Sequence, residues 1–234
     1  SYSEITTIIN RIKSSGSPCP LDHMSVIILK RCPFIRTILH RIISHCWTNK
    51  YFPKCWKKAF TILIHKKGDN VDPANFRPIT LQPVFAKVYS SLIRNRIYDF
   101  LLKNNFIESQ IQKGFWKGIS GTIEHTEMLS YLIDHARNKQ RQLIITLLDL
   151  KNAFGEVDLY LLKKVLDYHY LPQEIQSIIT EYYQNYYITI GTNNYRTNPI
   201  HVGKGVLQGD CLSPLLFNMI VNTLIKTIDQ EKIK

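Results

Sequence analysis

The chain has 234 residues, 44% of them hydrophobic and 21% charged, and its 30 basic and 18 acidic side chains leave a net charge of +12. A chain this long and this apolar can bury a core of its own, which excludes a disordered tail. Its longest apolar runs, such as residues 143–148, are far shorter than the roughly 18 residues needed to cross a bilayer, so we expect no membrane-spanning helix.

The first half of the chain is expected to contain helices around one β-hairpin. Residues 5–12 form a short helical stretch, residues 14–20 (SSGSPCP) a loop, and residues 35–47 an amphipathic helix. Residues 61–65 and 76–81 have strand character and are joined by the polar turn HKKGDNVDPAN, which predicts a basic hairpin. Apolar residues then recur at helical spacing over residues 83–104, with Pro83 at the start of the helix.

The second half is expected to contain four further helices and a buried strand. Residues 122–138 are predicted to be helical, and residues 143–150 (LIITLLDL) have the unbroken apolar pattern of a strand buried on both faces. Helical spacing returns at residues 159–167 and 173–186, and residues 187–195 are predicted to be a hairpin turning at Asn193 and Asn194. Ser213 is expected to cap a final helix over residues 215–228, with Pro214 at its first position.

Basic charge is concentrated in the first half of the chain. Residues 1–118 hold 19 Lys or Arg against 6 Asp or Glu, whereas residues 119–234 hold 11 against 12. A basic half is typical of a protein that binds a polyanion such as nucleic acid, and a merely solubilising surface is the alternative. The five cysteines have no Cys-x-x-Cys spacing and are expected to be free thiols; Cys46, near His40 and His45, is expected to pack in the core rather than to bind zinc.

Asp149 is the first candidate for chemistry because it ends the apolar run just before the sequence KNAF. A lone Asp at such a junction usually caps a turn. Phosphoryl transfer with two metal ions instead requires several carboxylates that converge on ions about 4 Å apart. The second interpretation therefore depends on what the other segments supply.

Four blocks of sequence together resemble the reverse transcriptase domain of non-LTR (LINE-type) retrotransposons. In chain order they lie within residues 56–97 (with KKGD and NFRPITLQPVFAKVYSSLIRNRI), 112–118 (QKGFWKG), 148–157 (LDLKNAFGEV) and 205–218 (GVLQGDCLSPLLFN). Any one block is weak by itself, but four in order are not expected by chance. Telomerases and group II intron proteins share the chemistry, and the NFRPITL and QKGF blocks favour the retrotransposon.

The resemblance implies an α+β fold: the fingers and a partial palm of a right-hand polymerase, rich in helices, with short antiparallel strands. It divides the chain into an N-terminal extension of the fingers (1–55), fingers (56–140) and a partial palm (141–234). The implied function is RNA-directed DNA synthesis by two-Mg²⁺ nucleotidyl transfer, with Mn²⁺ as a possible substitute. The implied partners are an RNA template, a DNA primer, deoxynucleoside triphosphates and the remainder of a polyprotein, in an intracellular, nuclear or cytoplasmic setting without a membrane.

The resemblance also assigns roles to single residues. Asp149 matches the first metal-binding aspartate, and Leu150 matches the residue whose carbonyl can join the metal. The residues that match positions around the nucleotide are Lys66, Lys67, Arg77, Ala153, Phe154 and Gln208. The residues that match contacts to template and primer are Gln112, Gly114, Phe115, Gly209, Ser213 and Pro214.

Each of these assignments has a structural alternative. The lysines could be a solvated charge run, Phe154 could be a core aromatic that only resembles the gate against ribonucleotides, and the QKGF block could be a plain turn.

The match to the family is incomplete in one important respect. Reverse transcriptases carry a second block with two adjacent aspartates, and no Asp-Asp pair occurs in these 234 residues. Asp210 is expected to belong to a turn, and Glu156 and Asp158 are expected to point away from Asp149. We therefore expect a piece of a longer enzyme, cut before the Asp-Asp block and inactive alone, or else a nucleic-acid-binding remnant of a decayed element.

Overall fold

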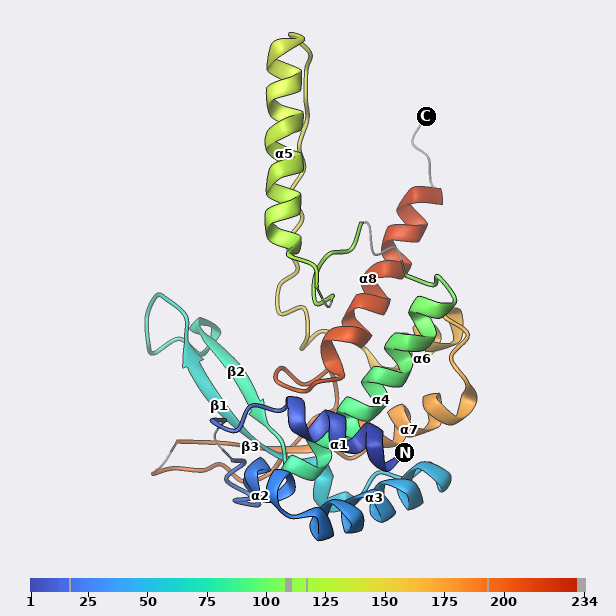
Figure 1. Ribbon diagram of the computed structural model, residues 1–234. Helices are drawn as coiled ribbons and strands as arrows, with labels where there is room; N and C mark the ends of the chain where they lie inside the picture. Colours follow the sequence, from blue (N-terminus) through green and yellow to red (C-terminus); the bar gives the residue numbers. More distant parts are fainter. Residues whose placement is uncertain (17, 108–110, 117, 193, 231–234) are drawn as a thin grey trace.

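A computed structural model describes residues 1–16, 18–107, 111–116, 118–192 and 194–230 (Figure 1). The α-helices that it describes are α1 (Tyr2–Arg11), α2 (Val26–Arg31), α3 (Pro33–Thr48), α4 (Val84–Lys103), α5 (Gly121–Asn138), α6 (Leu159–Tyr168), α7 (Gln173–Tyr183) and α8 (Ser213–Gln230). Its 3-10 helices are η1 (Lys54–Lys57) and η2 (Pro73–Asn75), and its strands are β1 (Lys58–His65), β2 (Phe76–Leu81), β3 (Tyr187–Ile190) and β4 (Ile200–His201). Among these helices, none is long and apolar enough to cross a membrane.

The four strands form one mixed sheet in the order β2-β1-β3-β4. β1 and β2 are the predicted basic hairpin, antiparallel with Phe60 opposite Leu81. β1 also pairs with β3, and this pairing is parallel, with Lys58 opposite Tyr187. The prediction of a helix-rich fold with a few short strands is confirmed, but the prediction that the strands are all antiparallel is wrong. A parallel neighbour so far along the chain leaves no local signal in the sequence.

α4 lies at the centre of the fold because its apolar residues are distributed around the whole helix. Ten of its twenty residues are buried, including the tyrosine Tyr89. The ring of Tyr89 stacks on Phe52 with centroids 5.2 Å apart, and Phe52 in turn meets Tyr182 of α7 at 4.4 Å. This aromatic cluster joins the segment after α3 to α4 and α7, and both halves of the chain share one core.

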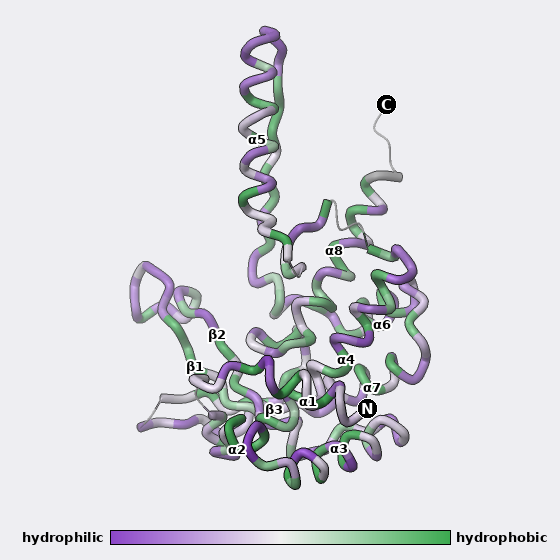
Figure 2. The backbone as a smooth tube through the Cα atoms, viewed as in Figure 1, coloured by the Kyte–Doolittle hydropathy of each residue, from purple (hydrophilic) through white to green (hydrophobic). Residues whose placement is uncertain are grey.

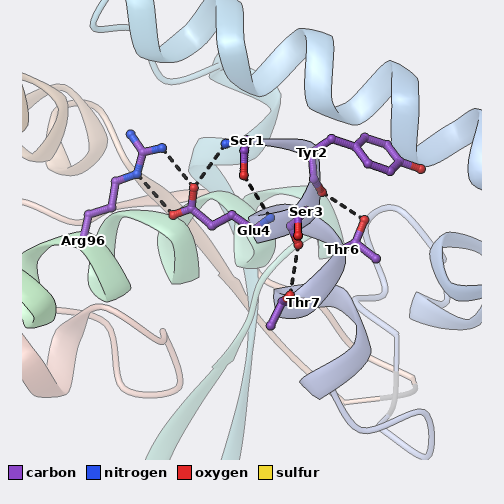
Figure 3. Close-up of polar contacts among 7 residues, drawn as sticks. All are labelled: Ser1, Tyr2, Ser3, Glu4, Thr6, Thr7 and Arg96. Carbon is purple, nitrogen blue, oxygen red and sulfur yellow. Dashed lines mark hydrogen bonds and ion pairs between the residues drawn. The ribbon is translucent and has the colours of Figure 1, made fainter.

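α1 is fixed to α4 by its first turn (Figure 3). Ser1 and Glu4 form a capping box, which satisfies backbone donors that a helix start otherwise leaves free. The Glu4 carboxylate also accepts hydrogen bonds from the Arg96 guanidinium at 3.2 and 3.0 Å. Ile5, Ile8 and Ile9 bury the other face of the helix. The predicted N-terminal helix is thus confirmed and begins three residues earlier than expected.

The segment 143–150 is not the buried strand that its composition predicts. It has no strand pairing and its side chains are exposed, with Ile144, Leu147 and Leu148 at 89%, 86% and 85%. α5, which has no buried residue, stands away from the rest of the fold, and this largely hydrophobic segment runs back beside it (Figures 1 and 2). Apolar β-branched residues favour a strand, but a strand buried on both faces also needs neighbours, and the described residues supply none.

The other predicted elements of the second half are present. α6 and α7 match residues 159–167 and 173–186, although α7 ends at Tyr183. The hairpin predicted over residues 187–195 contains β3 and a bridge between Gly191 and Arg196, and Asn193 of its predicted turn lies outside the described residues. α8 begins at Ser213 itself, so the expectation that Ser213 precedes the helix as its cap is wrong by one position.

Candidate functional site

The Gln-Gly block packs directly on strand β2. The Thr80 backbone N–H donates a hydrogen bond to the Gln208 carbonyl at 2.7 Å. Gly209 follows with φ +114°, and a Cβ there would lie 2.6 Å from the Thr80 carbonyl oxygen. Only glycine adopts this backbone conformation without strain and allows so close an approach. Two of the predicted site residues, Gln208 and Gly209, are therefore placed against the NFRPITL strand.

The same block also contacts the turn that follows the Asp149 segment. The Val206 N–H donates to the Phe154 carbonyl, and the Gly205 N–H donates to the Val157 carbonyl, both at 2.8 Å. A Cβ at Gly205 would lie 2.9 Å from the backbone of Gly155, so the two glycines let the two segments touch. This places the KNAFGEV turn beside the Gln-Gly block.

Phe154 lies in a small group of aromatic rings. It stacks on Phe217 of α8, with centroids 5.1 Å apart and planes at 17°, and it meets Phe115 edge-on at 6.1 Å. Phe154 and the preceding Ala153 are half-buried, whereas Phe115 is exposed and has a positive φ of 60°. Phe154 therefore packs as a core aromatic against Phe217. On the side of the exposed Phe115, the cluster stays open to solvent.

Asn218 links the QKGF block to α8 and was not predicted as a site residue. Its side-chain amide donates to the Gly114 carbonyl at 2.8 Å, and its oxygen accepts from the Gln112 amide at 3.1 Å. The residue is only 1% exposed. The sequence gives one signal for this residue, an amide within the otherwise apolar segment PLLFN. An amide that is buried requires hydrogen-bond partners. Gln112 and Gly114 are thus held against α8.

The predicted phosphate-binding cations stay on the exposed hairpin. Lys66 pairs through its backbone N–H with the Asn75 carbonyl at 2.8 Å, and its ammonium group is 3.4 Å from the Ala74 carbonyl. Lys66, Lys67 and Arg77 are exposed and form no ion pair within the part of the chain that the structure describes. The hairpin presents these charges to solvent, and within the described residues no hydrogen bond or ion pair joins them to Gln208 or Asp149.

The residues present do not fit a two-metal centre. Asp149 and Leu150 are exposed, and the described hydrogen bonds and ion pairs include neither side chain. Glu156 pairs with Lys204 at 2.6 Å, which lowers the pKa of the glutamate, and Asp158 caps α6. Across the described ranges, no three His, Cys, Asp or Glu side chains gather as metal ligands. A single exposed carboxylate cannot hold two ions, so we derive no step through a metal.

Asp210 is a turn residue, as predicted, but its carboxylate is buried. Its N–H donates to the Leu207 carbonyl at 3.3 Å, and its Oδ2 accepts from the Ser213 hydroxyl at 3.3 Å. Burial raises the pKa of this carboxyl group. Ser213 is itself fully buried beside the Tyr183 hydroxyl, so its side chain faces the interior, whereas Pro214 is half-buried. Ser213 could therefore help to bind a template only by starting α8, because its side chain is not available to contact the nucleic acid.

The candidate zinc residue is part of the core. Cys46 is buried, and burial raises the pKa of its thiol to about 11. A thiol that is hard to ionise is a poor metal ligand, because the metal binds the thiolate.

A comparison with protein families identifies the family of this chain. The family described as reverse transcriptase (RNA-dependent DNA polymerase) matches residues 64–234. This chain belongs to the reverse transcriptase family. The matched range contains the hairpin cations, the KNAF turn and the Gln-Gly block.

Curated relatives of this reverse transcriptase domain are proteins of mobile elements. The chain is 30% identical over 197 residues to the Pol polyprotein of a type-1 retrotransposable element R2 from Nasonia vitripennis, covering 84% of the chain and 18% of that protein. It is 28% identical to a probable RNA-directed DNA polymerase from transposon BS of Drosophila melanogaster (94% of the chain, 24% of that protein). It is 27% identical to the RNA-directed DNA polymerase of the mobile element jockey of the same fly (98% and 25%). The resemblance to non-LTR retrotransposons is thus confirmed, and the chain spans about a quarter or less of each relative.

Proposed function

We propose that this domain is the fingers and part of the palm of an RNA-directed DNA polymerase. Residues 1–55 would extend the fingers, residues 56–140 would form them, and residues 141–234 would form part of the palm. The observation that carries the proposal is the contact between β2 and the Gln-Gly block, through Thr80 and Gln208. This contact brings together two blocks of the family pattern that lie far apart in the sequence.

The assigned side chains are suited to a primer, a template and a nucleotide. Lys66, Lys67 and Arg77 would meet the triphosphate, because ammonium and guanidinium groups bind phosphate oxygens. Phe154, backed by Phe217, would exclude a ribose 2′-hydroxyl and so select deoxynucleotides.

The remaining assigned residues would meet the nucleotide and the nucleic-acid strands. Gln208 would lie near the nucleotide and the template base, with Ala153 leaving room for the nucleotide. The segment held by Asn218, which includes Gln112, Gly114 and Phe115, would meet the template together with Gly209 and Pro214, while Ser213 would contribute by starting α8.

The resemblance assigns Mg²⁺, or Mn²⁺ in its place, to Asp149 and the Leu150 carbonyl. Because these groups are exposed and without a second carboxylate, we propose that the chain alone does not catalyse nucleotide addition. The intact enzyme would act on an RNA template, a DNA primer and deoxynucleoside triphosphates, joined to the rest of its polyprotein, inside the cell.

Two assays test this proposal together. The purified chain should fail to extend a DNA primer on an RNA template with Mg²⁺, and extension that survives a control for contaminating polymerase would contradict the proposed inactivity. Binding of a labelled primer–template should nevertheless be measurable by fluorescence anisotropy.

A pair of charge variants then tests the assigned surface. Arg77→Ala should reduce the slope of log affinity against log salt by roughly 0.7 to 0.9, the value for one phosphate contact. The matched control, Arg137→Ala in the last turn of α5, should leave the slope unchanged. Equal slopes in the two variants would instead favour the alternative, a nucleic-acid-binding remnant without an organised polymerase surface.

A further inference from the structure

A stripe of exposed apolar side chains runs along the outer side of α3. Phe34, Ile38 and Ile42 are spaced four residues apart, so they lie on one side of the helix over more than two turns. All three are exposed, and the side chain of Phe34 is 72% accessible to solvent. The opposite side of α3 is buried in the core through Leu39 and Ile43. The stripe is therefore an apolar surface that the fold leaves without a partner.

The charges beside this stripe are all basic. α2 and α3 contain two lysine or arginine residues each and no Asp or Glu. Arg41 lies next to Ile38 and Ile42 on the helix surface, and Arg31 ends α2 just before α3 begins. Both arginines are exposed, and within the described residues neither forms an ion pair. We call the stripe and these two arginines together the α3 face.

α5 has the complementary character. Met128, Tyr131 and Leu132 are exposed at helical spacing, and the side chain of Tyr131 is 67% accessible to solvent. Glu127 precedes Tyr131 by four residues and Asp134 follows it by three, which puts both carboxylates next to it on the helix surface. Both acids are exposed, and neither forms an ion pair within the part of the chain that the structure describes. We call these five residues the α5 face.

The two faces lie at opposite ends of the molecule. Figure 1 shows α5 projecting from one end and α3 lying across the other end. The faces therefore cannot meet within one copy of the chain, although they match in two respects. Each offers an apolar stripe, and the arginines of one are opposite in charge to the carboxylates of the other.

We propose that the α3 face of one copy docks on the α5 face of a second copy. Burial of the two apolar stripes drives the contact, and the opposite charges determine which faces meet. Side chains four residues apart form the ridges that interdigitate when two helices pack. Because the two faces differ, each pair of copies keeps one free face of each kind, so the assembly grows head to tail beyond a dimer.

RNA is the competing occupant of a basic surface. Single-stranded nucleic acid binds through cations and through aromatic rings on which bases stack. Of the stripe, only Phe34 has such a ring, whereas Ile38 and Ile42 have no flat face for a base. The aliphatic side chains therefore favour a helix as the occupant.

Charge reversal on one face at a time tests the proposal. The variants Arg31→Glu/Arg41→Glu and Glu127→Arg/Asp134→Arg should each lower the association constant by about tenfold or more, because two attractive pairs become repulsive. An equimolar mixture of the two variants should restore association, since every α3 face then meets an α5 face of opposite charge on the other variant. Association would be measured by sedimentation velocity over a wide range of concentration, after nuclease treatment.

Matched reversals away from both faces provide the controls. Lys103→Glu/Lys163→Glu and Asp99→Arg/Glu174→Arg make the same changes in net charge at exposed positions of α4, α6 and α7. Both controls should associate like the unmodified chain.

A polar substitution separates the apolar contribution from the charges. Phe34→Ser/Ile38→Ser keeps every charge and changes only exposed side chains, so the fold should persist. This variant should also weaken association by about tenfold or more, because two side chains of the apolar stripe are lost.

Four results would overturn the proposal. They are a mass of one copy at every concentration, an association that nuclease abolishes because RNA bridges the copies, a mixture that fails to restore association, and an association that persists in both charge reversals and in Phe34→Ser/Ile38→Ser. The last result would place the contact elsewhere, for instance on the apolar run 143–148. None of the residues assigned to nucleotide, template or primer belongs to either face, so this proposal and the proposed function fail separately.

Discussion

The substitution Gly209→Ala should separate the Gln-Gly block from strand β2. At φ +114° an alanine is strained, and its Cβ would lie 2.6 Å from the carbonyl oxygen of Thr80. That oxygen belongs to the backbone of a paired strand, so it cannot move aside without disturbing the sheet. The hydrogen bond from the Thr80 N–H to the Gln208 carbonyl would be lost as the block shifts.

The size of the effect follows from these two contributions. A non-glycine residue in a sparsely populated backbone region costs about 1–3 kcal/mol. Loss of the hydrogen bond adds roughly 1 kcal/mol. We therefore expect the free energy of unfolding to fall by about 3 kcal/mol, and for a domain of this size the Tm to fall by roughly 6–12 °C.

The control for this experiment is Gly203→Ala. A Cβ at Gly203 would have its nearest neighbour at 3.8 Å, an ordinary contact, and its φ is not in the positive range. Both variants and the unmodified chain would be compared by urea unfolding and by calorimetry. If Gly209→Ala unfolds within about 0.5 kcal/mol of Gly203→Ala, then the close packing of the Gln-Gly block on β2 is wrong.

Three further predictions concern buried polar groups. Asn218→Ala should lower the free energy of unfolding by about 2 kcal/mol, since it removes the hydrogen bonds to Gln112 and Gly114; a loss under about 0.5 kcal/mol in urea unfolding would contradict these contacts. Burial raises the pKa of the Asp210 carboxyl group, so the folded chain binds the carboxyl proton more tightly than the unfolded chain does. The resulting contribution to stability is present at acid pH and is lost as the pH rises through the folded-state pKa. Asp210→Asn should therefore gain stability relative to the unmodified chain as the pH is raised from 4 to 7, and a pH-independent difference in urea unfolding would argue against a buried carboxylate. Burial lowers the pKa of His169 below 6.5, so its contribution is lost as the pH falls below 6.5 through the folded-state pKa. Replacement of His169 by Gln should flatten the pH dependence of stability in that window, and an unchanged profile would show that the ring is accessible to solvent.

The elements that depend on local signals could be predicted from the sequence. Both strands of the hairpin, the helix beginning after Pro83 and the helix over residues 122–138 were expected close to their observed bounds. In each case, apolar spacing and turn residues within a few positions determine the structure. The resemblance matched Gln208 and Phe154 to positions around the nucleotide, and in the structure Val206, two residues before Gln208, bonds to the backbone of Phe154.

The features that depend on distant partners could not be predicted in the same way. The run LIITLLDL has strand composition, but its expected burial required neighbours that the described residues do not supply. The burial of Ser213 and Asp210 results from packing against α7, far away in the chain. Asn218 was not predicted as a site residue, because an amide in an apolar helix does not reveal its acceptor, the distant Gly114 carbonyl.

The parallel pairing of β1 with β3 has a consequence for synthesis on the ribosome. Lys58 pairs with Tyr187, so β1 must wait for about 130 further residues before its second neighbour is made. At about 5–20 residues per second, this delay lasts roughly 6–26 seconds. Until β3 is made, the β1 edge of the nascent hairpin is bare in addition to the β2 edge, and a bare strand edge is the kind of surface on which other chains associate. Slowing translation between these two segments should therefore increase aggregation, whereas slowing it after residue 201 should not.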